Sequence, residues 1–309
     1  MKLLIYIIVY PLLWLISLLP FRILFLISDL LSFILFRIIG YRKKVISNNL
    51  KLALPNKTEK ERYAIQKKFY RHFTDVFIEV IKSITLSKKA IQKRFEFENI
   101  EVIQELGKKN KSVILVGSHY ANWEWMPSMS EKVPHHCIGV ANEIGNKYFD
   151  RMMNKNRTKF GGEIIYPRQA RKTYIKNFRE NKLVLNALVS DQTPTVGYTR
   201  HWHEFLNVFI PVHVGAEEMA KTFDQAYVFY TVEKVKRGRY KCHFKLITEN
   251  PKEFEDYKIT EMYLKEVEKQ IYEAPEYYFW THKRFKHKDK YEHWLKNNKF
   301  AKNIKKELQ

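Results

Sequence analysis

The chain contains few of the residues that build loops and linkers. Its 309 residues include only 10 Gly, 10 Pro and 2 Cys. No Gly-, Ser- or Pro-rich stretch divides it, so nothing indicates a flexible linker between two domains. Cys137 and Cys242 allow one disulfide at most and lack a metal-binding spacing, which favours a reducing compartment. We therefore expect one main domain, residues 41–309, behind a separate N-terminal segment, residues 1–40.

Acidic residues are scarce relative to basic ones. The chain has 55 Lys and Arg against 33 Asp and Glu, a net charge of +22. Such a surplus implies an anionic partner: nucleic acid, an anionic membrane surface or an acidic carrier protein. No helix-turn-helix, RNA-binding or zinc-finger signature is present, and the aromatic residues follow core periodicity. We expect no nucleic acid, and keep a non-catalytic basic membrane or nucleic-acid-binding protein as a distant alternative.

Charge is missing altogether from Leu3–Leu19, while the apolar stretch Phe21–Ile39 that follows holds only three charges. A membrane helix needs about 20 apolar residues, and the first stretch approaches this length. In the second stretch the polar residues share about half of the helix circumference, which predicts a helix lying in the membrane interface. The basic cluster Tyr41–Lys44 then predicts that the rest of the chain stays in the cytoplasm. The length of the first stretch and the lack of a cleavage site disfavour a signal peptide.

The remaining chain predicts an α/β fold with a mixed central sheet flanked by helices. Apolar runs and alternation predict strands, and the turn at Arg237-Gly238 predicts a hairpin. Thr58 with Glu61 predicts a capping box. The expected helices are Val45–Leu54, Thr58–Ile84, Asn122–Glu131, Lys147–Phe160, Gln169–Glu180, Gly215–Phe223 and Ile259–Tyr272. The expected strands are Ser112–Gly117, Cys137–Val140, Glu163–Tyr166, Leu183–Val189, Ala226–Lys234 and Tyr240–Ile247.

One strand leads directly into a pair of residues suited to acid–base chemistry. Ser112–Gly117 is followed by His119 and, five positions later, by Glu124. The carboxyl ends of strands in α/β sheets commonly present catalytic groups. We expect Glu124 to accept a hydrogen bond from one ring nitrogen of His119, which would raise the basicity of the other nitrogen. His119 is therefore the candidate general base, although the spacing alone is also compatible with a structural histidine.

Other histidines are candidates for a metal site. His201 and His203 are two apart on a strand-like segment, a spacing that can ligate zinc, and His135-His136 form a second pair. No third ligand follows at a suitable spacing, so we expect no metal.

Several ordered blocks resemble the late acyltransferases of lipid A biosynthesis, the lauroyl/myristoyl transferase family within the lysophospholipid acyltransferase superfamily. The sequence departs from the family pattern at Ser118, where Asn is common, and in the polar residues after Gln192. Phosphatidate-forming relatives carry a Glu-Gly-Thr-Arg block, which is absent here. The blocks are Tyr41–Leu50, Gly117–His119 with Glu124, Asn156–Gly162, Tyr166–Arg168, Val189–Pro194, Glu204–Asn207, Gly215–Glu217 and Tyr278–Phe285.

The resemblance implies transfer of a fatty acyl group from acyl carrier protein or coenzyme A to a hydroxyl of a lipid A precursor. It places the chain at the bacterial inner membrane with its catalytic domain on the cytoplasmic face, and it requires no cofactor. Arg157 and Arg168 are candidates for contacts to the oxyanion or to an acceptor phosphate, because guanidinium groups suit phosphate. Asp191 and Gln192 follow a buried strand and are further binding candidates. A lysophospholipid or aminolipid acceptor remains the nearest alternative.

Overall fold

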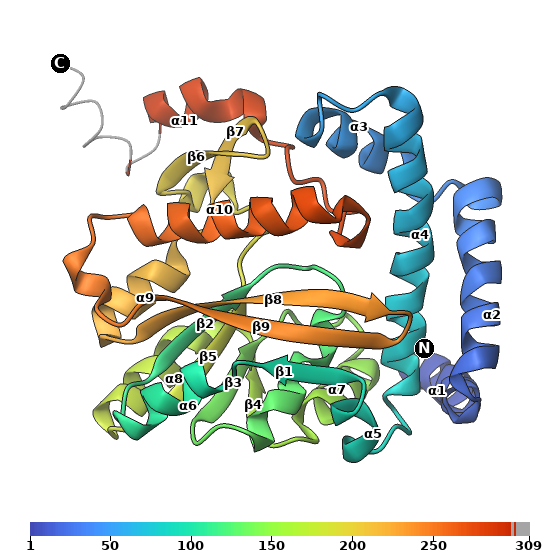
Figure 1. Ribbon diagram of the computed structural model, residues 1–309, viewed down its shortest axis with the longest axis horizontal. Coiled ribbons are helices and arrows are strands. Elements are labelled where there is room, and N and C mark those ends of the chain that lie inside the picture. The colour runs from blue at the N-terminus through green and yellow to red at the C-terminus, as the bar shows by residue number, and fades with distance from the viewer. Residues whose placement is uncertain (298–299, 301–309) are drawn as a thin grey trace.

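A seven-stranded sheet forms the centre of the molecule (Figure 1). We use a computed structural model, which describes residues 1–297 and 300. The strand order is β1-β9-β8-β2-β5-β3-β4, and only the β8–β9 pairing is antiparallel. The expected α/β class with a mixed central sheet is thereby confirmed. The strands are β1 Phe95–Glu98, β2 Val113–Gly117, β3 His136–Val140, β4 Glu163–Ile165, β5 Val184–Val189, β8 Ala226–Lys236 and β9 Arg239–Thr248.

Strand β2 lies in the middle of the sheet, between β5 and β8, and every one of its residues is buried. Its uninterrupted apolar sequence is typical of a parallel strand that is covered on both faces. Gly117 ends the strand under the ring of Tyr230, where an added Cβ would lie 2.1 Å from a ring carbon. Only glycine fits there, so β2 can end beside Tyr230 and release the chain toward His119.

Helices pack against the sheet, and most of them match the periodic segments of the sequence. In Figure 1, α10 lies on the opposite side of the β8–β9 hairpin from α6 and α8. The predicted capping box of α4 is present, since Glu61 N donates to Thr58 Oγ1 at 3.3 Å and Thr58 N to Glu61 Oε2 at 2.7 Å. The helices are α3 Lys43–Ala53, α4 Glu59–Lys82, α5 Lys88–Gln92, α6 Glu101–Lys108, α7 Lys147–Thr158, α8 Pro167–Arg179, α9 Gly215–Phe223, α10 Lys258–Glu273 and α11 Tyr291–Asn297.

The structure departs from the expected elements in several places, and helices α5, α6 and α11 were not expected. Asn122–Glu131 does not form an α-helix; Trp123–Glu131 is a 3₁₀ segment with Pro127 inside it, which removes a backbone donor. A second, two-stranded antiparallel sheet pairs β6 His201–Phe205 with β7 Val208–Val212, and β1 forms one edge of the main sheet. The segment of His201 and His203 was strand-like in the sequence, but the pairing was not predicted, since Pro211 within β7 argues against a strand.

The N-terminal segment folds into two helices, one for each of its two apolar stretches. Helix α1 spans Lys2–Leu18, and α2 spans Phe21–Phe33 and continues as a π-helix over Ile34–Ile39. Figure 1 shows α2 alongside α4. Among the described residues, no single helix has the length and apolar character needed to cross a membrane. One pair bent by 93°, Phe21–Ile39 with Lys43–Ala53, passes the criterion together, and α1 is a shorter apolar helix.

Ser28 and Asp29 of α2 face the protein, and several of its apolar residues face outward. Ser28 is fully buried and its hydroxyl donates to Asp75 Oδ1 of α4 at 2.7 Å. Asp29 forms an ion pair with Arg237 of the β8–β9 turn, with Oδ1 and Nη2 2.8 Å apart. Leu26 and Leu30 are 69% and 60% exposed. Within the expected polar stripe, Ser28 and Asp29 therefore contact α4 and the β8–β9 turn, whereas Arg22 and Arg37 are exposed.

Candidate active site

His119 lies in the loop directly after β2, and the C-terminal segment holds that loop in place. Phe279 N donates to the carbonyl of His119 at 3.0 Å, and Ala121 N donates to the carbonyl of Tyr277 at 3.0 Å. The imidazole packs against Trp123 and Phe279, with ring centroids at 5.3 and 5.8 Å, and these two rings also contact each other at 5.5 Å. Backbone pairing and ring packing therefore fix the position of the imidazole.

Ser118, which departs from the family pattern, also has a defined place. Its hydroxyl accepts a hydrogen bond from Gln270 of α10 at 2.9 Å, and both residues are buried. Tyr263 of the same helix donates its hydroxyl to the carbonyl of Gly117 at 2.8 Å. Helix α10 thus fixes the exit from β2, and Ser118 acts in that contact.

The carboxylate partner of His119 is Asp191. Nδ1 of His119 lies 2.7 Å from Oδ1 of Asp191, whose residue is only 1% exposed. Burial alone would lower the pKa of His119, but the charge and hydrogen bond of Asp191 outweigh it, so this pKa is raised above its ordinary value. Burial would likewise raise the pKa of Asp191, but His119 and then Arg284 lower it. Asp191 therefore stays ionised and holds the Nδ1–H tautomer, which leaves Nε2 free to act as a base.

The prediction that Glu124 accepts a hydrogen bond from His119 was wrong, because Asp191 is the carboxylate that contacts the ring. Glu124 instead pairs with Arg157 of α7, through Nε to Oε2 at 3.0 Å and Nη2 to Oε1 at 2.8 Å. Burial alone would lower the pKa of Arg157, but Glu124 raises it. A bidentate, charge-assisted pair of this kind is stronger than a single hydrogen bond to an imidazole. The guanidinium of Arg157 therefore binds both carboxylate oxygens of Glu124. Both members still line the cavity that contains His119.

The sheet register explains why His119 and Asp191 meet. Strands β2 and β5 are parallel neighbours with Gly117 opposite Val189, so the residues that follow each strand emerge at the same edge. Gln192 comes with Asp191, and its Nε2 lies 3.2 Å from Nε2 of His119. Both residues follow a buried strand, as predicted, and the strand register places them beside His119.

A cavity of about 940 Å³ is lined by His119. Its polar lining residues include Glu124, Arg157, Gln192 and His213. Its apolar lining residues include Leu115, Met126, Met129, Cys137, Ile138, Leu185, Leu188 and Met219. A cavity of this size accommodates a drug-sized or larger ligand. The arrangement therefore suits a molecule with a polar reactive group and a long apolar part.

Arg168 does not join the other candidates. It lies at the start of α8, largely exposed, and forms a two-fold ion pair with Glu143, both contacts at 2.8 Å. Its neighbour Pro167 reaches the cavity lining, but Arg168 does not belong to that lining. A residue on the first turn of a helix points away from its neighbour by about 100°, which explains the difference.

Two residues that sequence reasoning passed over complete the surroundings of Asp191. The fully buried Arg284 lowers the pKa of Asp191 by its charge and donates to Pro211 O at 3.3 Å. Nε2 of His282 accepts a hydrogen bond from the backbone N–H of Thr193 at 3.1 Å. Burial and, second, the charge of Arg284 lower the pKa of His282 to about 4. Both belong to the block Tyr278–Phe285, which carried the family resemblance. That block was the only available signal, because no local pattern links it to a site 90 positions away.

A family model described as bacterial lipid A biosynthesis acyltransferase matches residues 1–287 of the chain. The chain belongs to this family. The match covers the two N-terminal helices, the whole central sheet and the segment that contacts His119. The predicted family is therefore confirmed, and with it the prediction that the chain is an acyltransferase enzyme.

Individual relatives of this acyltransferase are distant. The lipid A biosynthesis lauroyltransferase of Escherichia coli strain K12 is 23% identical over 283 residues, 89% of each chain. The palmitoleoyltransferase of the same strain is 23% identical over 295 residues, 89% of this chain and 88% of the relative. The myristoyltransferase of that strain is 25% identical over 138 residues, 43% of this chain and 41% of the relative. The relatives thus differ in the acyl group that their names record, so likeness to them leaves the acyl chain of this enzyme open.

Proposed function

We propose that this enzyme transfers a fatty acyl chain from an acyl thioester to a hydroxyl group of a lipid A precursor, with His119 as general base. The observation that carries the proposal is the His119–Asp191 pair, with His119 lining a cavity of about 940 Å³ that many apolar side chains also line. A positioned base with a raised pKa serves the hydroxyl, and the apolar lining serves the acyl chain. Family membership supports the acceptor class.

In the proposed reaction, Nε2 of His119 takes the proton of the acceptor hydroxyl as its oxygen attacks the thioester carbonyl. Asp191 stabilises the imidazolium that forms, through the 2.7 Å contact to Nδ1. The tetrahedral intermediate then collapses, the carbon–sulfur bond breaks, and the leaving thiolate takes the proton from Nε2. The products are the ester, the free thiol and neutral His119. The reaction as written needs no cofactor beyond the thioester co-substrate.

The side-chain amide of Gln192 is our candidate hydrogen-bond donor to the oxyanion of the tetrahedral intermediate. Its amide nitrogen lies 3.2 Å from Nε2 of His119, where the acceptor hydroxyl must bind. An incoming hydroxyl would displace this contact and free the amide to donate to the developing negative charge. Arg157 lines the same cavity, and its pairing with Glu124 keeps both side chains in fixed positions. We propose that this pair orients the acceptor, and we place Glu124 in a binding role rather than as the partner of His119.

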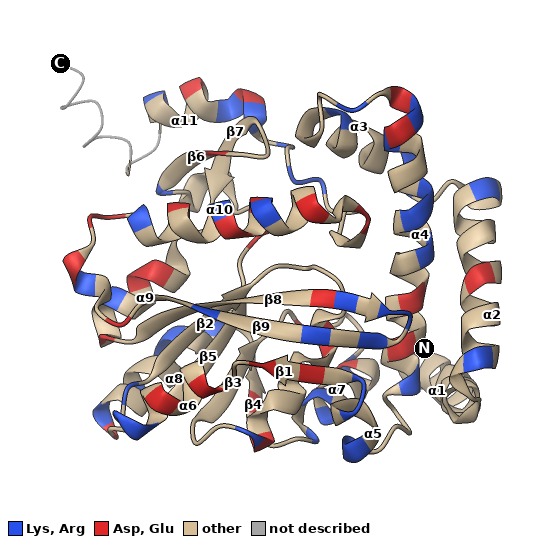
Figure 2. Cartoon of the chain, viewed as in Figure 1, with Lys and Arg blue, Asp and Glu red and all other residues tan. Residues whose placement is uncertain are grey.

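We further propose that α1 and α2 attach the enzyme to a membrane, with residues 1–40 as the anchor and residues 41–309 as one acyltransferase domain. Helix α1 carries a single charged residue, Lys2, and Figure 2 shows the rest of the helix free of charge. Most of its large apolar side chains are exposed, as are Leu26, Leu30 and Phe33 of α2. An apolar surface of this extent marks an interaction site. The cytoplasmic face of the bacterial inner membrane is the location consistent with Tyr41–Lys44.

The basic face of α8 is our candidate for docking an acidic acyl carrier protein. All five of its basic residues are exposed: Arg168, Arg171, Lys172, Lys176 and Arg179. The helix opens beside the cavity, since Pro167, Ala170 and Tyr174 are lining residues. Complementary charge would steer the carrier toward that opening and accelerate encounter.

The test is mass spectrometry of lipid A from cells with and without this chain, together with acyl transfer by the purified enzyme. We expect lipid A from deficient cells to lack one acyl chain, and wild-type enzyme but not His119→Ala to restore it. A matched control is His243→Ala, which changes a half-buried strand histidine outside the cavity lining. Unchanged lipid A with an altered lysophospholipid or aminolipid would move the acceptor to that class. Full activity of His119→Ala would refute the general base.

A further inference from the structure

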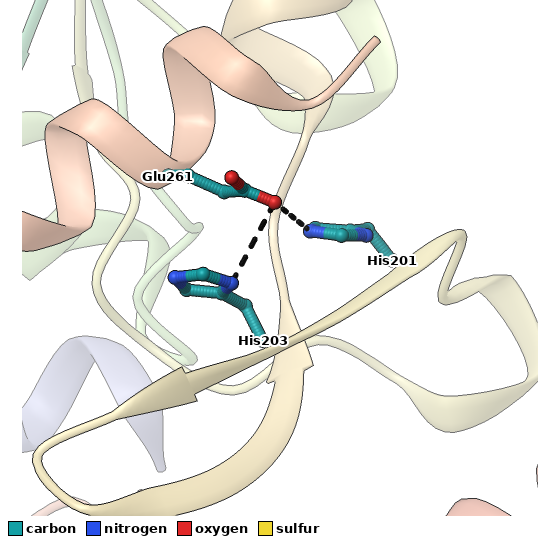
Figure 3. Close-up of side chains that lie close together, drawn as sticks. All are labelled: His201, His203 and Glu261. Atoms are coloured by element: carbon teal, nitrogen blue, oxygen red, sulfur yellow. Dashed lines mark hydrogen bonds and ion pairs between the residues drawn. The ribbon is translucent and has the colours of Figure 1, made fainter.

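We propose that His201, His203 and Glu261 form a binding site for a divalent transition-metal ion, with zinc as the best match. The three side chains come from β6 and α10 and lie outside the lining of the cavity that contains His119 (Figure 3). One ligand atom from each residue lies within 4.8 Å of the other two. The site is therefore independent of the proposed acyl transfer, and each can fail without the other.

Local geometry places the two imidazoles on one face. Residues two apart on a strand point to the same side, so His201 and His203 project together from β6. Their rings are nearly parallel, with centroids 5.9 Å apart. Tyr257 stacks on the other side of His201 at 4.6 Å, which limits rotation of that ring. Both nitrogen ligands are thus held in place before any ion binds.

Glu261 supplies the third ligand that the spacing of the sequence did not reveal. It lies in the first turn of α10, and Figure 3 shows its carboxylate pointing at both rings. Oε1 lies 3.2 Å from Nε2 of His201 and 3.6 Å from Nδ1 of His203. Oε2 instead accepts from Lys258 at 3.0 Å. The carboxylate is therefore oriented by Lys258 so that one oxygen alone faces the two nitrogens.

The two separations from Glu261 are close to the edge length of a zinc coordination tetrahedron. Bonds of about 2.0–2.2 Å at tetrahedral angles place neighbouring ligand atoms about 3.4 Å apart. The two measured separations, 3.2 and 3.6 Å, bracket that value. Two imidazoles and one carboxylate are also a donor set that zinc accepts, whereas magnesium and calcium prefer oxygen alone. Three protein ligands leave one coordination position for water or an anion.

A bound ion would join two parts of the fold that are distant in the sequence. The β6–β7 hairpin forms a sheet of its own, and α10 packs against the main sheet and holds Ser118. Cross-linking β6 to the first turn of α10 would stabilise the folded chain in proportion to metal occupancy. The expected role of the ion is therefore structural.

The experiment measures zinc binding to the full-length, tag-free enzyme after treatment with a chelator. Titration calorimetry and elemental analysis should give one zinc per chain, and zinc should raise the thermal unfolding temperature. His203→Ala and Glu261→Gln should each weaken binding by more than about 100-fold, because loss of even an outer partner costs about 10–100-fold. His243→Ala removes a half-buried strand histidine 3.5 Å from a glutamate and should bind as the wild type does.

Glu261→Gln keeps the size of the side chain, so it decides the matter if His203→Ala folds poorly. Cobalt provides a second readout, since a tetrahedral cobalt site has a visible absorption that both variants should lose. Absence of saturable binding in the wild type would overturn the proposal and leave a hydrogen-bonded cluster. Binding that survives both ligand variants would overturn it equally, because the ion would then be elsewhere.

Discussion

Replacing Asp191 by Asn tests the central contact of the candidate site. The change keeps the shape of a fully buried side chain 2.7 Å from Nδ1 of His119, but removes its charge. Without that charge, burial dominates and the pKa of His119 falls below its ordinary value of 6.5. The amide can also present its NH₂ group to Nδ1, which would hold the ring in the wrong tautomer.

Both effects weaken general-base catalysis. We expect kcat/KM to fall by about 10²–10⁴-fold, the usual contribution of a positioned base, which corresponds to about 3–5 kcal/mol of activation free energy. The base acts in its neutral form, so activity rises as the pH passes the pKa of His119. Because this pKa is raised in the wild type, the acid limb of the wild-type pH–rate profile should lie above pH 6.5. The acid limb of the Asp191→Asn profile should lie at lower pH.

The assay is the initial rate of acyl transfer from a labelled thioester, measured from about pH 5.5 to 9 for the wild type, Asp191→Asn and Glu124→Gln. Glu124 is the matched control, because it is a cavity carboxylate that pairs with Arg157 rather than with His119. Its replacement should raise KM for the acceptor and move the acid limb less than Asp191→Asn does. The reasoning is refuted if Asp191→Asn keeps the wild-type rate and limb, or if only Glu124→Gln shifts the limb.

Three further predictions concern stability and docking. Burial raises the pKa of Glu79 from 4.5 to about 7, so its contribution to stability is present below pH 4.5 and is lost as pH rises through 7. Glu79→Gln should remove about 3 kcal/mol of this pH dependence, measured by denaturant unfolding from pH 5 to 9. Gly117→Ala should lower the free energy of unfolding by about 1–3 kcal/mol, because the new Cβ overlaps Tyr230. Arg168→Ala should raise KM for an acidic carrier at low salt and leave kcat unchanged.

A specific experimental result would contradict each of these three predictions. An equally steep pH dependence of unfolding in Glu79→Gln would assign the effect to other groups. Wild-type stability of Gly117→Ala would show that Tyr230 moves aside without cost. A KM effect of Arg168→Ala that persists at 1 M salt would exclude electrostatic steering, because charges are screened within about 3 Å there.

Much of the secondary structure could be predicted from local patterns. The apolar run Ser112–Gly117 becomes β2, the helix Gly215–Phe223 matches α9 at both ends, and the capping box begins α4 where Thr58 and Glu61 indicate. These features depend on neighbouring residues, since burial on both faces, helical periodicity and a cap each act within a few positions. The β6–β7 hairpin was not predicted, because Pro211 within β7 argues against a strand there, although the segment of His201 and His203 was strand-like.

The sequence by itself determined that a histidine would follow a buried strand and that carboxylates would lie near it, because strand ends follow from local hydrophobicity. Only the tertiary structure decided which carboxylate the histidine received. Asp191 reaches it through the parallel pairing of β2 with β5, while Arg157 arrives on α7 and engages Glu124. The same holds for Glu261, which meets His201 and His203 through packing alone. Contacts between residues tens of positions apart depend on strand order and register, which no local pattern records.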